Sequence, residues 1–310
     1  MKNRRLYDLI IIGGGPAGVA AGIYGARQKM DALLITKNFG GQIARKAVNI
    51  ENYPGFEEIS GFDLVSRFEK HLRKNKIDIE RDEVKKVSKI NNKFLVETTN
   101  KNIFQAKTVL IASGADPRPL ELKGEKEFLG RGVSYCTLCD APLFSKKTVA
   151  VIGGGNAGFE AAIALSKWAK RVYILEYGKQ VAADSENQEQ VKKIKKIKII
   201  LNAEAKEFKG KKFLEQLIYS DKKNKKIISL KIDGAFIEIG SQPATSFVKG
   251  LVEFNEKDEI KIDPFSGQTS CPGIFAAGDA DNLPFKQIVI AAGEGAKAVI
   301  AAYGYLQKRK

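Results

Sequence analysis

The sequence has very little cysteine and almost no histidine, which limits the metal chemistry available to it. Its 310 residues include three cysteines and one histidine. A structural zinc site needs about four ligands of matching geometry, and beyond Cys136 and Cys139 only Cys271 and His71 could complete one. We therefore predict no metal site. Three cysteines are also too few for a scaffold held together by disulfides.

Long apolar runs are missing as well. No segment approaches the ~20 apolar residues that span a bilayer, so we expect no membrane partner. The first apolar run, Leu9 to Ile12, ends at once in Gly13-Gly14-Gly15, which predicts a strand rather than a secretory leader. An isolated cysteine pair fits a reducing compartment, and we expect a cytoplasmic protein.

Acidic residues are outnumbered by basic ones. The chain has 52 Lys and Arg against 36 Asp and Glu, and its net charge is +16. The lysines are scattered over the chain, which predicts a basic surface that steers acidic proteins or anionic cofactors. Nucleic-acid binding is the alternative, but no recognised nucleic-acid motif accompanies the charge. We expect no nucleic-acid partner. Length and a hydrophobic content of 44% predict a soluble globular chain of two domains.

A nucleotide-binding pattern opens the chain. Residues 8–12 form an apolar run typical of a buried parallel strand, and Gly13, Gly15 and Gly18 follow at Gly-x-Gly-x-x-Gly spacing. The first glycine allows a tight turn, the second lets the backbone approach a pyrophosphate, and the third lets the helix that begins near Ala17 pack closely. With a second strand expected over residues 32–35, the pattern predicts a bound nucleotide.

The next segments predict loops, one helix and a small antiparallel sheet. Residues 40–42 and 51–55 are rich in glycine and amides, which is typical of loops that face a ligand. A helix is expected over residues 61–75. Strands are expected over residues 79–88, 93–99, 102–105 and 108–112, and the proline-flanked turn at 113–119 predicts a domain boundary.

The sequence then begins again. Residues 148–176 repeat residues 8–36 at an offset of 140, so that the three glycines recur as Gly153, Gly155 and Gly158. Ile111-x-x-Gly114-x-x-Pro117 also recurs, as Ile237-x-x-Gly240-x-x-Pro243. Two copies of one nucleotide-binding architecture are therefore predicted, the second inserted into the first.

The two copies differ at the end of their second strand, where Thr36 of the first is matched by Glu176 of the second. A carboxylate at this position can accept hydrogen bonds from both hydroxyls of an adenosine ribose and would repel a 2'-phosphate. Glu176 therefore favours NADH over NADPH. A solvated acid at a strand end is the alternative.

The remaining segments predict one helix, a second small sheet and a return to the first domain. Val191, Ile194 and Ile197 recur every third residue, which predicts a helix capped by Asp184 or Ser185. Residues 204–232 predict a lysine-rich antiparallel sheet. A strand then delivers Asp279 at its carboxyl end, and a helix of small residues over 291–302 suits close packing on a ligand.

One segment between the two glycine patterns carries redox chemistry. Cys136-Thr137-Leu138-Cys139-Asp140 places two thiols two residues apart, so they can close and reopen a disulfide, and the following acid can exchange protons with the thiolates. A pair of buried, inert thiols is the alternative. Cys271 precedes a proline in a turn, and we expect it to be structural.

These motifs together resemble the low-molecular-weight thioredoxin reductases over nearly the whole chain. The resemblance is carried by the two glycine patterns, Gly40-Gly41-Gln42, Glu51-Asn52-Tyr53-Pro54-Gly55, the Cys-x-x-Cys-Asp segment, Pro272 to Asp279 and Lys286-Gln287-Ile288. It is especially close to the reductase half of the alkyl hydroperoxide reductase flavoprotein, at Cys139 to Phe144 and Leu201-Asn202-Ala203. We expect no amino-terminal thioredoxin-like extension of the kind that flavoprotein carries.

The resemblance implies an α/β fold of two Rossmann-like, three-layer ββα domains, with FAD on residues 1–117 and 243–310 and a nicotinamide nucleotide on the inserted residues 118–242. It implies FAD contacts at Gly13, Gly15, Pro16, Ala17, Gly18, Gln42, Asn52, Gly114, Gly278, Asp279, Gln287 and Ile288. It implies NADH contacts at Gly153, Gly155, Asn156, Ala157, Gly158 and Glu176. NADPH users of the family carry a basic cluster where this chain has Glu176-Tyr177-Gly178-Lys179-Gln180.

The implied activity is electron transfer from NADH, with NADPH as the second candidate, through FAD to the Cys136–Cys139 disulfide. Asp140 is the implied proton donor or acceptor, and the final acceptor is a disulfide of a thioredoxin-like or glutaredoxin-like protein. A homodimer is implied as well. The alternatives are a flavin reductase linked to peroxide reduction, and a flavoprotein that senses redox state without turnover.

Overall fold

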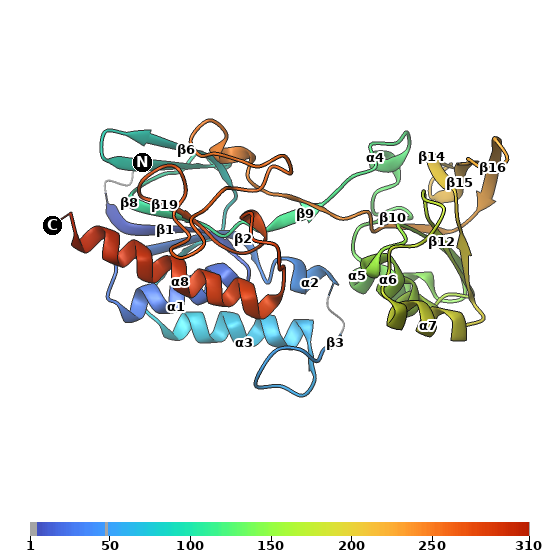
Figure 1. Ribbon diagram of the computed structural model, residues 1–310, viewed down its shortest axis with the longest axis horizontal. Helices are drawn as coiled ribbons and strands as arrows, with labels where there is room; N and C mark the ends of the chain where they lie inside the picture. The colour runs from blue at the N-terminus through green and yellow to red at the C-terminus, as the bar shows by residue number, and fades with distance from the viewer. Residues whose placement is uncertain (1–4, 47–48, 310) are drawn as a thin grey trace. The chain divides into compact units, whose positions relative to one another are not determined.

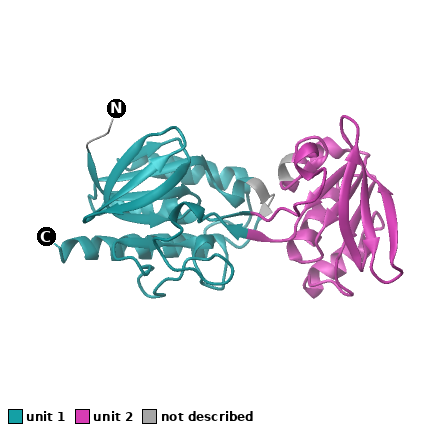
Figure 2. Ribbon diagram, turned by 90° about the horizontal axis from the view of Figure 1, so that it is seen from above, with its two compact units in different colours: residues 1–116, 242–310 teal, residues 117–241 magenta. Residues whose placement is uncertain are grey.

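The computed structural model describes residues 5–46 and 49–309 of the chain, without the side chains of Arg45, Lys46, Asn49, Leu138 and Cys139. The chain divides into two compact units, residues 1–116 with 242–310 and residues 117–241 (Figure 2). Each unit is built around its own parallel sheet. Throughout the described ranges, no helix is long and apolar enough to cross a membrane.

The first unit has a seven-stranded sheet in the order β5-β2-β1-β8-β7-β6, with β19 beside β8 (Figure 1). Its strands in this sheet are β1 (Leu6–Gly14), β2 (Ala32–Phe39), β5 (Asp78–Glu80), β6 (Val84–Ile90), β7 (Lys93–Thr98), β8 (Ile103–Ile111) and β19 (Ile274–Ala276). Its helices are α1 (Pro16–Arg27), α2 (Gln42–Lys46), α3 (Gly61–Lys74) and α8 (Ile288–Gln307). The short elements β3 (Asn49–Ile50), β4 (Ile59–Ser60), η2 (Ser246–Val248) and η3 (Gly278–Ala280) complete it.

The apolar residues of β1 explain why this unit has two layers on its sheet. Side chains alternate along a strand, so Leu9 and Ile11 face one side, where they join the core beneath α1 and α8. Ile10 and Ile12 face the other side and join a core that includes Val87 of β6 and residues of the 248–280 segment. Helices α1, α3 and α8 lie along the first face (Figure 1).

The second unit repeats this plan. Its parallel strands β10 (Val133–Ser134), β17 (Gly234–Ile237), β11 (Thr148–Ile152), β12 (Arg171–Leu175) and β13 (Ile197–Ile200) pair in that order. Its helical segments are α4 (Glu125–Phe128), α5 (Thr137–Asp140), η1 (Ala141–Phe144), α6 (Asn156–Ser166) and α7 (Ser185–Lys193). A separate antiparallel sheet consists of β14 (Ala203–Gly210), β15 (Leu214–Asp221) and β16 (Lys226–Lys231).

Strand β11 again divides the core by alternation. Val149 and Val151 pack with the helix residues around Phe159, whereas Ala150 and Ile152 pack toward the antiparallel sheet with residues such as Leu217. The result is a helix layer, a parallel sheet and an antiparallel sheet. The α/β, Rossmann-like fold class predicted from the sequence is confirmed.

The chain passes between the units through two short strands that form a sheet of their own. β9 (Ala115–Pro117) pairs with β18 (Ser241–Pro243). At one end Ala244 N donates to Gly114 O at 3.0 Å, and at the other Arg118 N donates to Gly240 O, also at 3.0 Å. The segment at 113–119, expected as a turn, is therefore partly strand.

Three of the expected elements are wrong in detail. The helix capped by Asp184 ends at Lys193, because Ile194 adopts an extended conformation and Ile197 begins β13, which pairs with Val172. The expected strand over 79–88 is two strands, and the first of them, β5, pairs in parallel with β2. Gln42, placed in a loop by its glycine neighbours, begins α2.

Candidate nucleotide and dithiol sites

The first glycine loop has the steric need for glycine that the spacing predicts. Gly13 has a φ of +114°, and a Cβ on it would lie 2.1 Å from Ala112 O. A Cβ on Gly18 would lie 1.9 Å from Gly13 O, so helix α1 approaches the strand backbone directly. A Cβ on Gly15, in contrast, would meet no atom within 4 Å. The second glycine therefore leaves open space at the start of α1, where Pro16 and Ala17 form the first turn.

Other predicted residues gather at this end of the sheet. Gln42 Nε2 donates to Asp279 Oδ2 at 2.5 Å across 237 positions of sequence. Gly41 lies next to Gly15, since a Cβ on it would be 3.7 Å from Gly15 Cα. Gly278 has a φ of +75°, and a Cβ on it would lie 3.2 Å from Ala17 Cβ.

A second contact ties the loop around Asn52 to the start of α8. Asn52 Nδ2 donates to Gln287 Oε1 at 3.3 Å. Gln287 is the N-cap of α8, and Ile288 begins the helix and packs against a small core with Ile43 and Ile50. Gly114, with a φ of +69°, lies at the crossover and accepts from Ala244 N.

These residues fit a dinucleotide. The first turn of α1 contains no acidic residue, its N-terminal backbone is uncovered at Gly15, and helix N-termini favour phosphate groups. Around it lie amide and carboxylate groups on Gln42, Asn52, Asp279 and Gln287 that can pair with hydroxyls and ring nitrogens.

Two buried acids near this site have no counterpart in the sequence-based prediction. Glu294 on α8 is 8% exposed, and Asp281 is fully buried. Burial, followed by the charge of Asp281, raises the pKa of Glu294 to about 7. The one sequence signal was an acid inside the run Ala291-Ala292-Gly293-Glu294-Gly295, which otherwise consists of small residues.

The second glycine loop reproduces the first. Gly153 has a φ of +124°, and a Cβ on it would lie 2.2 Å from Glu238 O. A Cβ on Gly158 would lie 2.0 Å from Gly153 O, and a Cβ on Gly155 would meet nothing within 4 Å. Asn156, followed by Ala157, begins α6, and its Oδ1 accepts from Asp184 N at 2.7 Å.

Glu176 lies against this second loop. Its Oε2 accepts from Gly154 N at 2.8 Å, and its Oε1 accepts from Gly178 N at 2.5 Å. The side chain is half-buried. Both carboxylate oxygens are therefore held by backbone amides of the loop.

The redox segment is ordered by short-range contacts around Cys136. Ser134 Oγ accepts from Cys136 N at 2.9 Å, and Asp140 N donates to Cys136 O at 3.2 Å, which closes the turn of α5. Thr137 Oγ1 donates to Glu238 Oε1 at 3.3 Å in the interior. Asp140 is half-buried, and the Cys139 side chain lies outside the described residues.

Tyr135, directly before Cys136, is fixed by a buried acid that the sequence did not reveal. Glu125 is 2% exposed and accepts hydrogen bonds from the Tyr135 hydroxyl and from the amides of Leu120 and Leu122. Burial and this carboxylate raise the pKa of Tyr135. The segment leading to Cys136 is thereby tied to α4.

Elsewhere in the described part of the chain, we identify no further candidate site residue. Cys271 is a buried free thiol, as expected of a structural cysteine. Among the described side chains, no three His, Cys, Asp or Glu gather as metal ligands.

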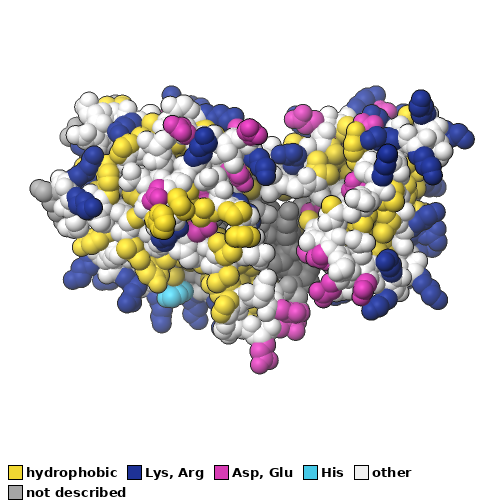
Figure 3. Space-filling view, viewed as in Figure 1, with side chains coloured by type: hydrophobic (Ala, Val, Ile, Leu, Met, Phe, Trp, Pro, Cys, Tyr) yellow, Lys and Arg dark blue, Asp and Glu magenta, His cyan; other side chains and the backbone are white. Residues whose placement is uncertain are grey.

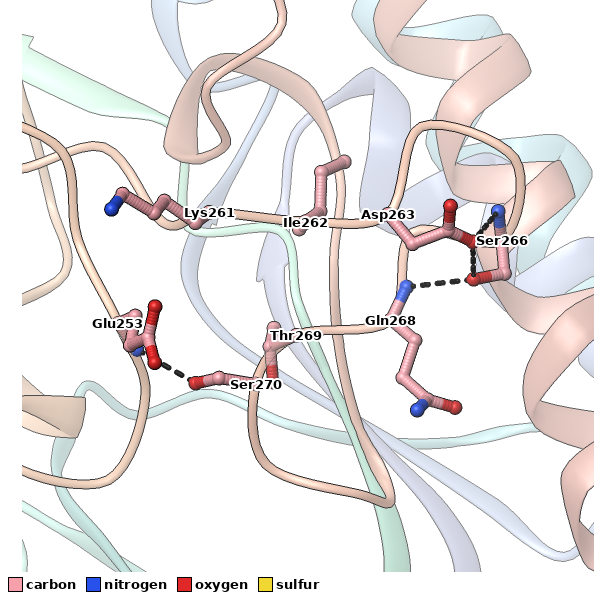
Figure 4. A pocket seen from close by; sticks show the side chains of 8 residues that line it. All are labelled: Glu253, Lys261, Ile262, Asp263, Ser266, Gln268, Thr269 and Ser270. Carbon is pink, nitrogen blue, oxygen red and sulfur yellow. Dashed lines mark hydrogen bonds between the residues drawn. The ribbon is translucent and has the colours of Figure 1, made fainter.

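A pocket of about 470 Å³ lies on the 253–270 segment (Figure 4). It is lined by Glu253, Lys261, Ile262, Asp263, Ser266, Gln268, Thr269 and Ser270. On the face shown in Figure 3, Lys and Arg are spread over both units.

Comparisons with known proteins agree with this architecture. Residues 7–299 match the family model for pyridine nucleotide-disulphide oxidoreductases. An alkyl hydroperoxide reductase protein of Escherichia coli, its F component, is 38% identical over 100% of this chain and 60% of its own length. A Bacillus subtilis protein named NADH dehydrogenase is 36% identical over 98% of this chain and 59% of its length. The chain thus spans about 60% of the length of these curated relatives.

Solved structures extend the comparison to the whole fold. Thioredoxin reductase of Lactococcus lactis, in its FR conformation, aligns with a TM-score of 0.91 at 34% identity, covering 97% of this chain and 99% of that one. The T. acidophilum thioredoxin reductase aligns with a TM-score of 0.89 at 35% identity, covering 99% and 100%. The chain belongs to the pyridine nucleotide-disulphide oxidoreductases. Membership of this family implies FAD and a pyridine nucleotide as cofactors.

Proposed function

We propose that the protein is an FAD-dependent disulfide reductase that passes electrons from NADH to a disulfide of a thioredoxin-like or glutaredoxin-like protein. One observation carries the proposal: each unit has a glycine loop with an open second glycine, and the unit with the second loop also carries the Cys-x-x-Cys segment. The thioredoxin reductases of similar structure support it.

FAD would be held by the first unit. Gly15 and the first turn of α1 would face the pyrophosphate, while Gln42 and Asp279, already 2.5 Å apart, would face hydroxyl groups. Asn52 and Gln287 would contribute amide groups from the other loop. When bound, the flavin supplies two-electron transfer between a nicotinamide and a disulfide.

The dithiol would be Cys136 and Cys139, with Asp140 as the proton donor or acceptor. Disulfide exchange requires a thiolate, a leaving thiol and access to the partner. Helix α5 places Asp140 N against Cys136 O, so the acid and the first cysteine belong to one turn. The Ser134 and Glu125 contacts would keep this turn in place during exchange.

NADH would bind the second glycine loop. Glu176 is held beside Gly154 with both oxygens oriented by amides, and each carboxylate oxygen has a further lone pair for a ribose hydroxyl. The Bacillus subtilis relative is named for NADH. A homodimer located in the cytoplasm completes the proposal.

The test uses the full chain and a protein disulfide. Cys136→Ser should keep reduction of bound flavin by NADH and lose reduction of a thioredoxin-like disulfide, because the conduit to the partner is cut. Cys271→Ser is the matched control, since that thiol is buried apart from the predicted site residues, and it should behave as the wild type. Turnover of the protein disulfide by Cys136→Ser at the wild-type rate would overturn the proposal, because Cys136 would then not be part of the conduit. A wild type that reduces small acceptors but no protein disulfide would favour the flavin reductase instead.

A further inference from the structure

The backbone N–H and C=O groups of Gly278 each contact an ionisable side chain. Gly278 N donates to Glu294 Oε2 at 2.8 Å. Lys286 Nζ lies 3.5 Å from Gly278 O, and donates more closely to Asp281 O at 2.6 Å. We infer that Glu294 is a positioning residue for FAD. By holding the Gly278 turn, Glu294 directs Asp279 toward Gln42. This inference rests on the proposed function.

The contacts form a continuous path from α8 to α2. Gly278 adopts a left-handed conformation, with a φ of +75°, so the direction of the next residue depends on how its peptide is held. That next residue, Asp279, accepts from Gln42 Nε2 at 2.5 Å. Glu294 is also close to the glycine loop, because α8 packs on α1 so tightly that a Cβ on Gly295 would lie 2.0 Å from Ala17 O.

The same cluster is costly for the fold. Glu294 and Asp281 are both buried, and burial raises the pKa of both carboxyl groups. Asp281 Oδ1 accepts from Leu283 N and Lys286 Nζ, but its Oδ2 has no hydrogen-bond partner among the described residues. Two buried carboxyl groups beside one half-buried ammonium group cost free energy that apolar side chains would not. A role in holding the cofactor site accounts for their presence.

The charge state of the cluster should therefore affect FAD. The charges of Asp281, Lys286 and Lys297 act on Glu294. When Glu294 ionises, near pH 7, the cluster gains a negative charge beside a site for a dinucleotide that is itself an anion. FAD retention should consequently weaken as the pH rises through about 7.

The experiment measures release of FAD from the full-length protein after dilution, by the rise of free flavin fluorescence, between about pH 6 and about pH 8. The wild type should release FAD up to about tenfold faster at the upper pH. Glu294→Gln keeps an oxygen acceptor for Gly278 N but cannot ionise, so its release rate should change little with pH. Glu294→Leu should release FAD at least about tenfold faster at every pH, because the Gly278 amide loses its acceptor. Glu256→Gln, on the surface, should follow the wild type.

Two results would overturn the inference. One is a Glu294→Leu variant that folds and retains FAD like the wild type, and the other is a Glu294→Gln variant that keeps the wild-type pH dependence. A wild type that takes up no FAD overturns the proposed function itself and this inference with it. If FAD uptake is normal but the release rates of the variants are identical, only the role of Glu294 is contradicted.

Discussion

Glu176 Oε2 accepts a hydrogen bond from Gly154 N at 2.8 Å, so the acid at the end of β12 and the glycine loop after β11 are one structural unit. The other oxygen is held by Gly178 N. A ribose with free hydroxyls can donate to these oxygens, whereas a 2'-phosphate would bring a second anion to the same place. We therefore expect the hydrogen bonds of Glu176 to affect which nucleotide binds.

The nucleotide preference should depend on Glu176. A like-charged or unpaired group at a binding site costs about 1–3 kcal/mol, so the wild type should prefer NADH by roughly ten- to a hundredfold in kcat/KM. Glu176→Arg should shift this ratio toward NADPH. Glu176→Gln, which removes only the charge, should fall between the two. Steady-state kinetics with both nucleotides provide the comparison, and equal use of NADPH by the wild type would show that Glu176 does not select the nucleotide.

Two substitutions in the second glycine loop should have different effects, one on folding and the other on NADH binding. A Cβ at Gly158 would lie 2.0 Å from Gly153 O, so Gly158→Ala should destabilise the second unit by about 1–3 kcal/mol. A Cβ at Gly155 meets no protein atom within 4 Å, so Gly155→Ala should fold normally and weaken NADH binding by about tenfold, because the methyl group occupies the approach of the pyrophosphate. Thermal unfolding and NADH titration of both variants check this. Normal NADH affinity in Gly155→Ala would mean that the pyrophosphate does not approach this glycine.

The folded chain should become less stable as the pH rises, because Glu294 ionises. Its pKa is about 7 in the folded chain against an ordinary 4.5, so the folded state favours the protonated carboxyl and loses stability as the pH rises from about 4.5 through about 7. Above that range Glu294→Gln should be more stable than the wild type by about 1–3 kcal/mol. Urea unfolding of the full chain at one fixed FAD concentration measures the difference. A constant difference between the two proteins at every pH would contradict this assignment.

The sequence predicts the glycine loops correctly because their requirement is steric and local. Gly13 and Gly153 need positive φ angles, and Gly18 and Gly158 allow a helix to touch a strand backbone. Because glycine satisfies both requirements and other residue types do not, these positions are visible in the sequence as glycines at a fixed spacing. The same holds for the apolar runs of β1 and β11, which follow from burial on both faces of each strand.

Long-range contacts could not be predicted in this way. The acids Glu125, Glu238 and Glu294 are ordinary glutamates in the sequence, and their hydrogen bonds with Tyr135, Thr137 and Gly278 form only in the folded chain. The end of α7 was predicted wrongly for a related reason. Ile197 continues a helical period, but pairing with Val172 in the sheet determines its conformation.

An anaerobic titration with NADH, followed by the visible absorbance of the flavin, tests the central claim most directly. If electrons pass beyond FAD to the Cys136–Cys139 disulfide, the wild type should take up about two equivalents of NADH per chain before excess NADH appears, and Cys136→Ser about one. Equal uptake by the two proteins, or a protein that binds no flavin, would contradict the account.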